Sequence, residues 1–203
     1  MTTLRRVSLS ISFDSRMRLP CLSTRRLLLR PFEPSDATAV QRLAGDARVA
    51  DTTKNIPHPY PDGAAEAWIS SHRMLIQEGK QVVFAITDRS TTELCGAISL
   101  RLSDEKEIAE LGYWTGVPFW GQGIATEATE AVCGYGFAAL KLYWIVGWHL
   151  VRNPASGRVM QKAGMTADAG VSKTLLKNGK QERLVSCSIS SEHWMSLQRS
   201  SAL

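Results

Sequence analysis

The segment from Tyr113 to Thr126 contains the clearest chemical signal in this chain. Residues 113–119 form an aromatic, β-rich run, and Gly121 and Gly123 then open an Ala/Thr/Glu segment of helical character. The N–H groups at the start of a helix lack intrahelical partners and carry partial positive charge, so a glycine-bearing turn at that point can hold an anion. The segment therefore predicts a ligand that carries phosphate.

The residues after this turn separate three kinds of phosphate site. A Walker-type loop ends in Gly-Lys-Ser/Thr, and no lysine follows Gly123. A dinucleotide fingerprint needs a small residue where Thr126 stands and an acidic residue about 20 positions further on, whereas residues 131–167 contain no Asp or Glu. That acid-free span favours a ligand with additional phosphate, which points to coenzyme A. Its basic side chains are those of Lys141, His149, Arg152, Arg158 and Lys162.

Three segments carry a resemblance to a known family. They are Glu110-Leu-Gly-Tyr-Trp114, Trp120-Gly-Gln-Gly-Ile-Ala-Thr-Glu-Ala128 and Asn153-Pro-Ala-Ser-Gly-Arg-Val-Met-Gln-Lys-Ala-Gly-Met165. In this order they resemble the motifs of the GNAT superfamily of acetyl-CoA-dependent N-acetyltransferases, over nearly the whole chain. Within the superfamily, the chain is similar to the branch that acetylates the N-terminal Ser or Ala of ribosomal proteins.

This resemblance implies acetyl-CoA as the cosubstrate, no bound metal ion, and the fold of the GNAT superfamily. The family's pyrophosphate loop, Gln/Arg-x-x-Gly-x-Gly/Ala, covers residues 120–125; Trp120 departs from its first position, where an aromatic residue is usual in this branch. A glycine turn that only caps a helix is the alternative interpretation. The residues that the resemblance assigns to cofactor binding are Tyr113, Trp114, Thr115, Trp120, Gly121, Gln122, Gly123, Ile124, Ala125, Thr126, Asn153 and Ser156.

Transfer of an acetyl group from a thioester to an amine requires a neutral amine, a stabilised oxyanion and a proton for the departing thiolate. Glu110 is the candidate base, because it precedes the cofactor loop and matches the base glutamate of family members that use one. A cross-strand pair would explain Glu110 without catalysis, and His149 on the next predicted strand is a weaker candidate base. Gly112 suggests a β-bulge that splays two strands, as in the family.

Asn153 and Ser156 lie at the start of a predicted helix. Asn before Pro is a common N-cap, and Ser156 belongs to the same turn, so capping alone could explain both. In the resembling branch the matching Asn contacts the pantetheine arm and the matching Ser lies near the sulfur. The resemblance therefore makes Ser156 the second catalytic candidate, as a hydrogen-bond donor to the thiolate, while Asn153 both caps the helix and binds the cofactor.

The elements that must position these residues alternate between strand and helix. They predict one α/β domain (α+β mixed sheet) over residues 21–203, and the resemblance adds a mostly antiparallel sheet splayed at a β-bulge and flanked by about four helices. We expect strands at 26–32, 81–87, 94–102, 107–115 and 143–150, and a hairpin of 165–176 with 182–190. The expected helices are 34–44, 62–78, 121–140 and 154–163.

The acceptor side is less defined by the sequence. Thr52–Pro61, a proline-stiffened loop, and Lys177–Lys180, the hairpin tip, are candidates for walls of the acceptor pocket. Segments of this kind are more often plain surface loops. Their residue types do not identify an acceptor.

Charge and composition exclude several classes of protein. The 203 residues are 44% hydrophobic, which suits one enzyme-sized domain. Residues 1–20 hold four arginines and one aspartate, so they carry +3 of the net charge of +5 and leave little basic character for a nucleic-acid surface. No apolar stretch of about 18 residues is present, so no membrane span is expected.

Residues 1–20 are Ser- and Arg-rich and are expected to be a disordered N-terminal extension, with a transit peptide or an upstream start before Met17 as alternatives. Four widely separated cysteines form no metal-binding spacing and favour a reducing cytoplasm, with the thiols as small buried groups. They are Cys21, Cys95, Cys133 and Cys187.

The predicted function is transfer of acetyl from acetyl-CoA to a primary amine by direct attack in a ternary complex, with a protein N-terminal α-amine as the first candidate acceptor. The alternatives are acetylation of a polyamine, an aminoglycoside or an amino acid, and a non-catalytic acyl-CoA-binding module. We expect a monomer or homodimer whose partners are acetyl-CoA and the amine, with no membrane or direct nucleic-acid contact.

Overall fold

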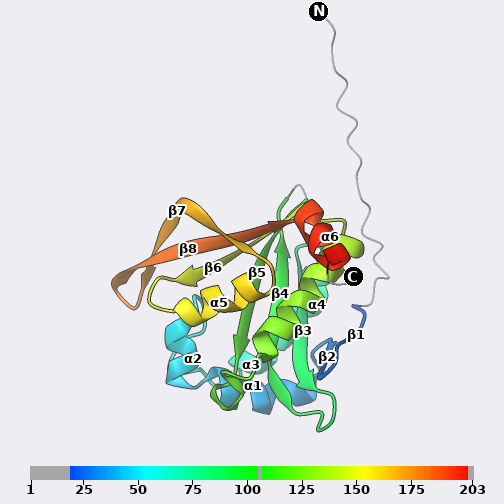
Figure 1. The fold of residues 1–203 in the computed structure, drawn as a ribbon. Coiled ribbons are helices and arrows are strands. Elements are labelled where there is room, and N and C mark those ends of the chain that lie inside the picture. The colour runs from blue at the N-terminus through cyan, green and yellow to red at the C-terminus, as the bar shows by residue number, and fades with distance from the viewer. Residues whose placement is uncertain (1–18, 105–106, 201–203) are drawn as a thin grey trace, which may run out of the picture.

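The computed structural model describes residues 19–104 and 107–200, and residues 1–18, in which most of the predicted extension falls, lie outside that part. A single mixed sheet runs through the centre of the molecule (Figure 1). Its strands are β1 (Leu22–Ser23), β2 (Leu27–Arg30), β3 (Gln81–Asp88), β4 (Leu94–Leu102), β5 (Ile108–Thr115), β6 (Trp144–Leu150), β7 (Thr166–Lys177) and β8 (Lys180–Ser190).

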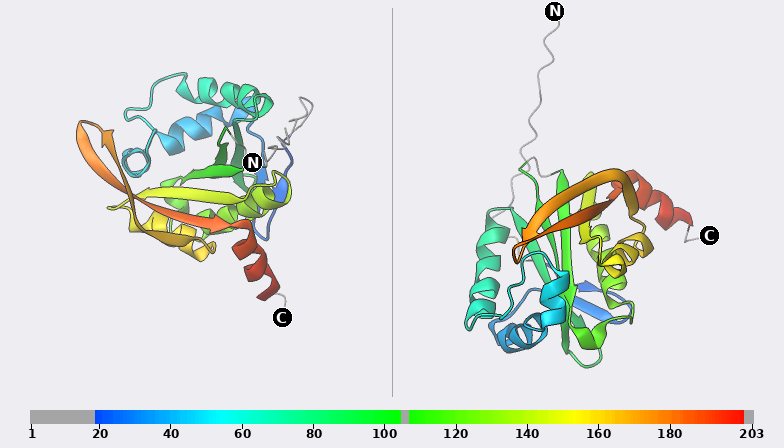
Figure 2. Two further views of the ribbon diagram at one scale, coloured as in Figure 1. Left: turned by 90° about the horizontal axis from the view of Figure 1, so that it is seen from above. Right: turned by 90° about the vertical axis from the view of Figure 1, so that its left-hand side faces the viewer.

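Helices cover both faces of this sheet (Figure 2). The α-helices are α1 (Ala37–Ala44), α2 (Ala47–Thr52), α3 (Ala64–Gln77), α4 (Ile124–Ala138), α5 (Pro154–Lys162) and α6 (Ser191–Ser200), and the short 3₁₀ helices are η1 (Pro34–Asp36) and η2 (Val117–Phe119). Helices α1 and α3 pack against one face, where Val40, Leu43 and Ile69 are buried. Helix α4 packs against the other face over a larger core, and α5 continues that layer beside β6.

The strand order is β1-β2-β3-β4-β5-β6-β8-β7, and β5 and β6 are the parallel pair in an otherwise antiparallel sheet. Their pairing runs from Ile108 opposite Trp144 to Leu111 opposite Gly147. Beyond Leu111, β5 continues to Thr115 and β6 to Leu150 without further pairing between them. The two strands therefore separate at the centre of the sheet.

This separation confirms the predicted splay but not its cause. The register between β4 and β5 is continuous from Ala109 to Thr115, so the expected bulge at Gly112 is wrong. Register shifts lie instead between Ile86 and Thr87, and in β7 between Ala167 and Ser172. Two side chains beyond the end of the pairing reach α5: the Tyr113 hydroxyl of β5 bonds to Ser156, and His149 of β6 packs on Gly157.

The mixed α/β fold with a mostly antiparallel sheet is confirmed, with two corrections. Six α-helices are present in the described chain rather than about four. Helix α2 has only six residues and gave no periodic signal, whereas α6 is polar but packs Trp194 against Phe137. Cys95, Cys133 and Cys187 are buried as expected, but Cys21 is exposed beside β1. Among the helices described, none is long and apolar enough to cross a membrane.

Candidate active site

The predicted glycine turn joins η2 to α4. Gly121 and Gly123 have φ angles of 74° and 77°, in the left-handed region that favours glycine, and Gly123 is the N-cap of α4. Two side chains of the turn bond back to the chain before it: the Trp120 indole donates to the Thr115 carbonyl at 2.8 Å, and the Gln122 amide donates to Pro118 at 2.7 Å. The unpartnered N–H groups of the first turn of α4 are thus held in a fixed position.

The chain before β2 braces this turn from outside. Arg26 donates from its Nε to Glu127 at 2.7 Å and from Nη1 to the Gln122 carbonyl at 2.9 Å, while Thr24 donates to Glu127 at 2.6 Å. Burial alone would raise the pKa of Glu127, but these hydrogen bonds outweigh it and lower that pKa. The acidic side chain in the first turn of α4 is therefore ion-paired and offsets less of the positive end of the helix.

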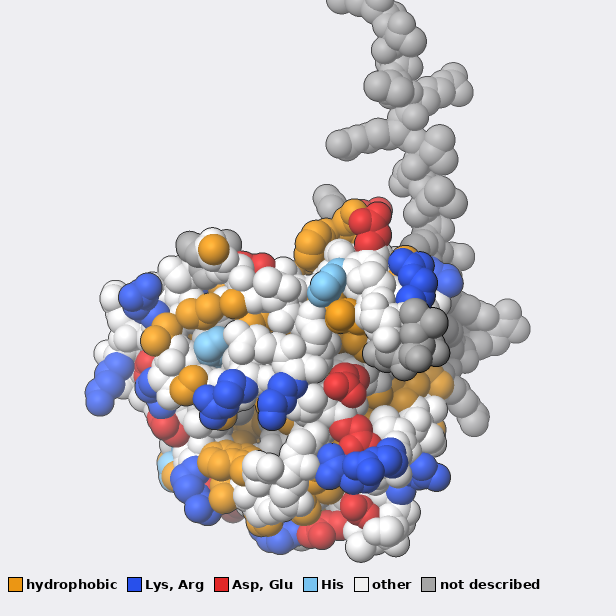
Figure 3. Space-filling view, viewed as in Figure 1, with side chains coloured by type: hydrophobic (Ala, Val, Ile, Leu, Met, Phe, Trp, Pro, Cys, Tyr) orange, Lys and Arg blue, Asp and Glu red, His pale blue; other side chains and the backbone are white. Residues whose placement is uncertain are grey.

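A cavity of about 310 Å³ lies in front of this turn, between α4 and α5. All the residues predicted to bind the cofactor line it except Gln122, whose side chain and carbonyl are engaged as described above. Arg158 and Lys162 also line the cavity. They were expected only as basic residues of the acid-free span and not as cofactor-binding residues, although their i, i+4 spacing places them on one face of α5. Figure 3 shows this face of the molecule, with Lys and Arg side chains among hydrophobic ones.

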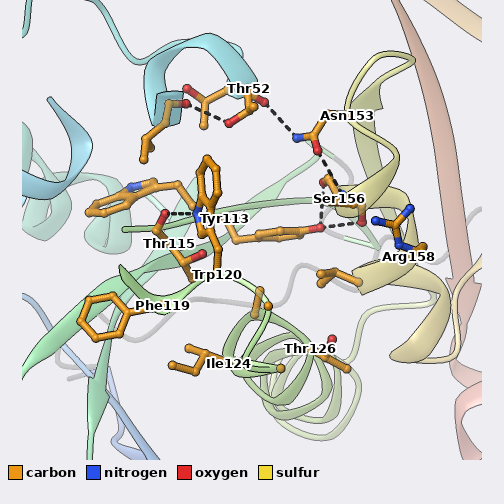
Figure 4. A pocket seen from close by; sticks show the side chains of 18 of the residues that line it. Thr52, Tyr113, Thr115, Phe119, Trp120, Ile124, Thr126, Asn153, Ser156 and Arg158 are labelled. Carbon is orange, nitrogen blue, oxygen red and sulfur yellow. Dashed lines mark hydrogen bonds between the residues drawn. The ribbon is translucent and has the colours of Figure 1, made fainter. Parts of the chain in front are cut away.

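The inner end of the cavity contains a small hydrogen-bond network (Figure 4). The Asn153 side chain accepts from the Ser156 N–H at 3.3 Å, which confirms the predicted cap, and its Nδ2 reaches the Thr52 carbonyl at 3.5 Å. The Tyr113 hydroxyl lies 2.8 Å from both the carbonyl oxygen and the Oγ of Ser156. Burial raises the pKa of Tyr113, so the phenol stays protonated through the neutral range.

A second cavity, of about 450 Å³, lies on the α3 side of the sheet. Its floor is formed by β3 to β6, and its sides by α3 and the loop after α2. Glu110 lines it, half-buried, and the register places Arg101 of β4 opposite. Among the residues that the structure describes, Glu110 has no hydrogen-bond or ion-pair partner, so the cross-strand pair that would explain it structurally is not formed.

His149 borders this groove at the gap between β5 and β6. Its Nδ1 lies 2.9 Å from the Leu150 carbonyl, which can only accept a hydrogen bond, so Nδ1 is the donor in this contact. Nε2 faces Gly157, where an added Cβ would come within 2.7 Å. The contact explains the glycine at this position of α5 and gives His149 a packing role.

His72 of α3 forms part of the same groove. The residue is 6% exposed, and its ring lies edge-on to Phe32 and Trp68. Neither ring nitrogen has a hydrogen-bond partner within the described chain, and burial lowers the pKa of His72 to about 4. The sequence alone does not single out His72, because a single histidine on a helix gives no signal of its own.

The predicted acceptor loop lines the groove through residues 52–57, but the hairpin tip does not. The hairpin instead clasps the loop from outside: Lys177 Nζ donates to the Thr53 carbonyl at 2.6 Å. Arg152 bonds to Asp51 at 2.5 Å and to Glu182 at 2.9 Å, so it ties α2 to β8. Neither cavity is lined by any of residues 177–180, which are all described.

The two cavities meet at the splayed strands. They share Thr52, Thr53, Tyr113, Trp114 and Ser156, which come from the end of α2, from β5 and from α5. Ligands in the two cavities can therefore meet in the gap between β5 and β6, where the sheet has no inter-strand hydrogen bonds.

A family model described as "Acetyltransferase (GNAT) domain" matches residues 26–166. The chain belongs to the GNAT family. It is 30% identical over 161 residues to the uncharacterized N-acetyltransferase YoaA of Bacillus subtilis, covering 79% of this chain and 90% of YoaA. As a GNAT enzyme, the protein is an acetyl-CoA-dependent N-acetyltransferase.

Solved structures of GNAT enzymes share the fold. The ribosomal L7/L12 α-N-protein acetyltransferase RimL, in complex with coenzyme A, superposes with a TM-score of 0.72 at 19% identity, covering 84% of this chain and 98% of RimL. A chimera of spermidine N-acetyltransferase from Vibrio cholerae and hSSAT superposes with a TM-score of 0.68 at 18% identity, over 83% and 98% of the two chains. Relatives of this fold thus act on both proteins and small amines, so the fold leaves the acceptor class open.

The cofactor of a GNAT enzyme is a cosubstrate that no metal needs to hold. In the described part of the chain, no group of three or more His, Cys, Asp or Glu side chains could bind a metal ion. The cavity before α4 fits acetyl-CoA chemically, because it offers helix N–H groups and the basic side chains of Arg158 and Lys162 to phosphate, with an aromatic wall at Trp120.

Proposed function

We propose that this GNAT enzyme acetylates the α-amino group of a peptide, by direct attack of the amine on acetyl-CoA. The observation that carries the proposal is the meeting of the two cavities at Tyr113, Trp114 and Ser156. Acetyl-CoA in the cavity before α4 would bring its thioester to this junction, and the amine would approach from the groove on the α3 side. No cysteine lines either cavity in the described chain, so an acetyl-enzyme intermediate on a thiol has no candidate residue.

Glu110 is the group that would help to remove the proton of the attacking amine, directly or through water. An α-amine with a pKa of about 8 is already neutral to roughly a tenth at pH 7, whereas a lysine amine near 10.4 is neutral well below a tenth of a per cent. The unpartnered carboxylate on the groove floor suits the lighter task. His149 is a poorer choice because its Nδ1 is bonded to the Leu150 carbonyl and its Nε2 is packed against Gly157.

Ser156 is the group that would meet the departing sulfur. Its hydroxyl lies at the junction of the two cavities and at the N-terminal turn of α5, where the helix dipole also favours negative charge. The parent thiol has a pKa near 8.5, so the thiolate needs a hydrogen bond during departure and takes its proton later from water. A hydrogen bond is therefore sufficient, and the serine does not have to ionise.

The charges around the acceptor groove favour a peptide over a polycation. The charged side chains of its lining are Lys54, Arg101 and Glu110, two cations and one carboxylate. A polyamine or an aminoglycoside would bring several positive charges into this surrounding, which is unfavourable even in a solvent-screened groove. A peptide brings a single α-amine, and its backbone carries no positive charge once that amine is neutral.

A turnover screen with acetyl-CoA tests the proposal. The acceptors are peptides that start with Ser, Ala or Met, together with spermidine, an aminoglycoside and free amino acids. We expect the highest kcat/KM for one of the peptides, and an Nα-acetylated product by mass spectrometry. A higher kcat/KM for spermidine would instead place this protein among the small-molecule acetyltransferases. Loss of the best activity on blocking the peptide α-amine distinguishes the α-amine from side-chain amines.

A further inference from the structure

Tyr113 occupies the point where β5 leaves β6. Ala109 and Leu111 precede it on the same face of the strand and are buried in the core. Since the pairing with β6 ends at Leu111, the next side chain on this face has no strand beside it and extends to α5. The resemblance assigned Tyr113 to cofactor binding, but its hydroxyl lies beside that of Ser156, the proposed hydrogen-bond donor to the sulfur.

Two acceptors compete for the single proton of the Tyr113 phenol. The phenol oxygen lies 2.8 Å from the Ser156 carbonyl oxygen and 2.8 Å from Ser156 Oγ. If the phenol donates to the carbonyl, then the short contact to Oγ requires the serine hydroxyl to donate to the phenol oxygen. If the phenol donates to Oγ, the serine proton is free to point elsewhere. The position of the phenol proton therefore decides where Ser156 can donate.

We propose that Tyr113 is a positioning residue that turns the Ser156 hydroxyl proton towards the departing sulfur by transferring its own hydrogen bond from the Ser156 carbonyl to Ser156 Oγ. No covalent bond changes in this step, because both protons stay on their oxygens and only the two O–H directions change. The inference rests on the role proposed above for Ser156. It adds a second residue, on a different element, to the stabilisation of the thiolate.

The surroundings keep the free-energy cost of switching this hydrogen bond small. The Ser156 carbonyl lies in α5, where the amide four residues further on is its regular helical donor, so it keeps a partner when the phenol turns away. The Asn153 cap holds the Ser156 backbone meanwhile. Burial keeps the phenol protonated at neutral and moderately alkaline pH, so the donor remains present throughout an assay. A chain of two hydroxyls also polarises each member towards the developing charge.

A double-mutant cycle tests the inference, with Tyr113→Phe, Ser156→Ala and the double variant. A hydrogen bond to a charged group predicts that each single change lowers kcat by about 10- to 100-fold, with the KM for acetyl-CoA nearly unchanged. Because Tyr113 acts through Ser156, the double variant should be no slower than Ser156→Ala alone. The Tyr113→Phe deficit should also stay constant from pH 6 to pH 9, since the phenol does not ionise in that range.

Tyr135→Phe is the matched control. Tyr135 lies in α4 with its ring against Phe84, away from both cavities, and should leave kcat unchanged. Additive losses in the double variant would overturn the inference, as would an unchanged kcat for Tyr113→Phe or a loss confined to acetyl-CoA affinity. An unchanged kcat for Ser156→Ala would remove Ser156 from the mechanism proposed above, and the inference with it. A slow Ser156→Ala beside a normal Tyr113→Phe overturns the inference alone.

A measurement on the unaltered enzyme covers the case in which Tyr113→Phe does not fold, as judged by its circular dichroism and melting curve. With a poor acceptor, so that the chemical step limits turnover, kcat is measured in mixtures of H₂O and D₂O. As charge develops on the sulfur, the hydrogen bonds of both hydroxyls tighten together while the protons stay on their oxygens, so two exchangeable sites change and predict a curved dependence on the deuterium fraction. A linear dependence, which indicates a change at a single exchangeable site, would contradict the coupled hydroxyl pair.

Discussion

The two cavities are built in different ways. The cavity before α4 depends on backbone geometry: a turn with two left-handed glycines, hydrogen bonds from Trp120 and Gln122 that fix it, and Arg26 that braces it from outside. The acceptor groove depends on side chains from separate elements, with Glu110 and His72 both lacking partners in the described chain. The first cavity offers unpartnered backbone N–H groups held by a braced turn, whereas the second offers unpartnered side-chain groups that its ligand would complete.

This difference matches what the two ligands require. A phosphate ligand is bound by N–H groups whose positions a helix start sets in advance, so little reorganisation is needed on binding. An amine must be recognised and also relieved of a proton, which needs a side chain with a free carboxylate. We therefore expect substitutions on the cofactor side to change binding, and substitutions on the acceptor side to change turnover, acceptor affinity or pH dependence.

Glu110→Gln is the strongest test of chemistry on the acceptor side. We expect kcat/KM to fall by roughly 10² to 10⁴, as for a lost general base, with a deficit that shrinks as pH rises because more of the amine is already neutral. Acetyl-CoA affinity should remain the same, since Glu110 does not line the other cavity. The measurement is a pH series of steady-state kinetics. Glu93→Gln, in the exposed turn before β4, is the control and should have no effect.

Two other outcomes would change the interpretation of Glu110. A loss of the same size at every pH would indicate that the carboxylate positions the amine. Full activity across the series would exclude Glu110 from the mechanism, and the groove would then only bind.

Gly123→Pro tests the backbone character of the cofactor side. Proline cannot adopt the φ of 77° found here and removes an N–H at the start of α4, so we expect coenzyme A affinity to fall about 10- to 100-fold by calorimetry. Gly63→Pro is the matched control, because Gly63 is the left-handed N-cap of α3, with a φ of 76°, and lies outside both cavities. It should cost stability but not affinity. Equal affinity in the Gly123 variant would refute the assignment of the turn to phosphate.

His72, on the acceptor side, makes the stability of the protein depend on pH between about 4 and 6.5. Burial depresses the pKa of His72 from 6.5 in the unfolded chain to about 4, so the unfolded chain binds a proton in this interval and the folded protein does not. The free energy of unfolding is therefore highest above pH 6.5 and decreases as pH falls towards 4. The expected loss between pH 7 and pH 5 is about 2 kcal/mol, a change of about 30-fold in the folding equilibrium.

His72→Leu should remove this dependence. Leucine has no nitrogen to protonate and none to leave unpartnered, so at pH 7 the variant should be as stable as the parent or more stable by about 1 kcal/mol. Denaturant unfolding of the parent and the variant at pH 5 and pH 7 tests whether the pH dependence of stability is lost. The same decrease in both would show that another group titrates. A large loss of stability at pH 7 in the variant would show that His72 has a partner in solution, such as an ordered water.

The same contrast decides how much of the site the sequence could predict. Residues 113–126 are contiguous, so the glycine pattern located the turn, and the family resemblance assigned nearly all the side chains around it. Gln122 was the exception, because its type and position suited a ligand contact while its side chain instead closes the turn on Pro118. The bulge predicted at Gly112 was wrong for a related reason: the glycine suggested irregular backbone, but the register with β4 is regular there, and β5 leaves β6 after Leu111.

The acceptor groove could not be predicted in this way. It joins α3, four central strands and the loop after α2, and the pairing of these elements depends on long-range register. The sequence placed Glu110 on the correct strand, yet it gave no means of seeing that Arg101 would lie opposite without forming a pair. The hairpin was recognised from Asn178-Gly179, but its contact with the acceptor loop required the tertiary structure.

Loss of the contact between the hairpin and the acceptor loop should have the smallest effect we expect, and it should change acceptor affinity alone. Lys177 is 9% exposed, and its Nζ donates to the Thr53 carbonyl at 2.6 Å, at the edge of the groove. Lys177→Met keeps most of the aliphatic stem but removes the donor, so the loop after α2 loses one of the hydrogen bonds that hold it. We expect the KM for the peptide acceptor to rise about threefold to tenfold, the net value of one hydrogen bond, while the KM for acetyl-CoA and kcat stay constant. Lys180→Met, across the same turn and exposed, is the matched control. If both variants behave alike, the hairpin does not position the acceptor loop, and the groove is formed by the sheet and α3 alone.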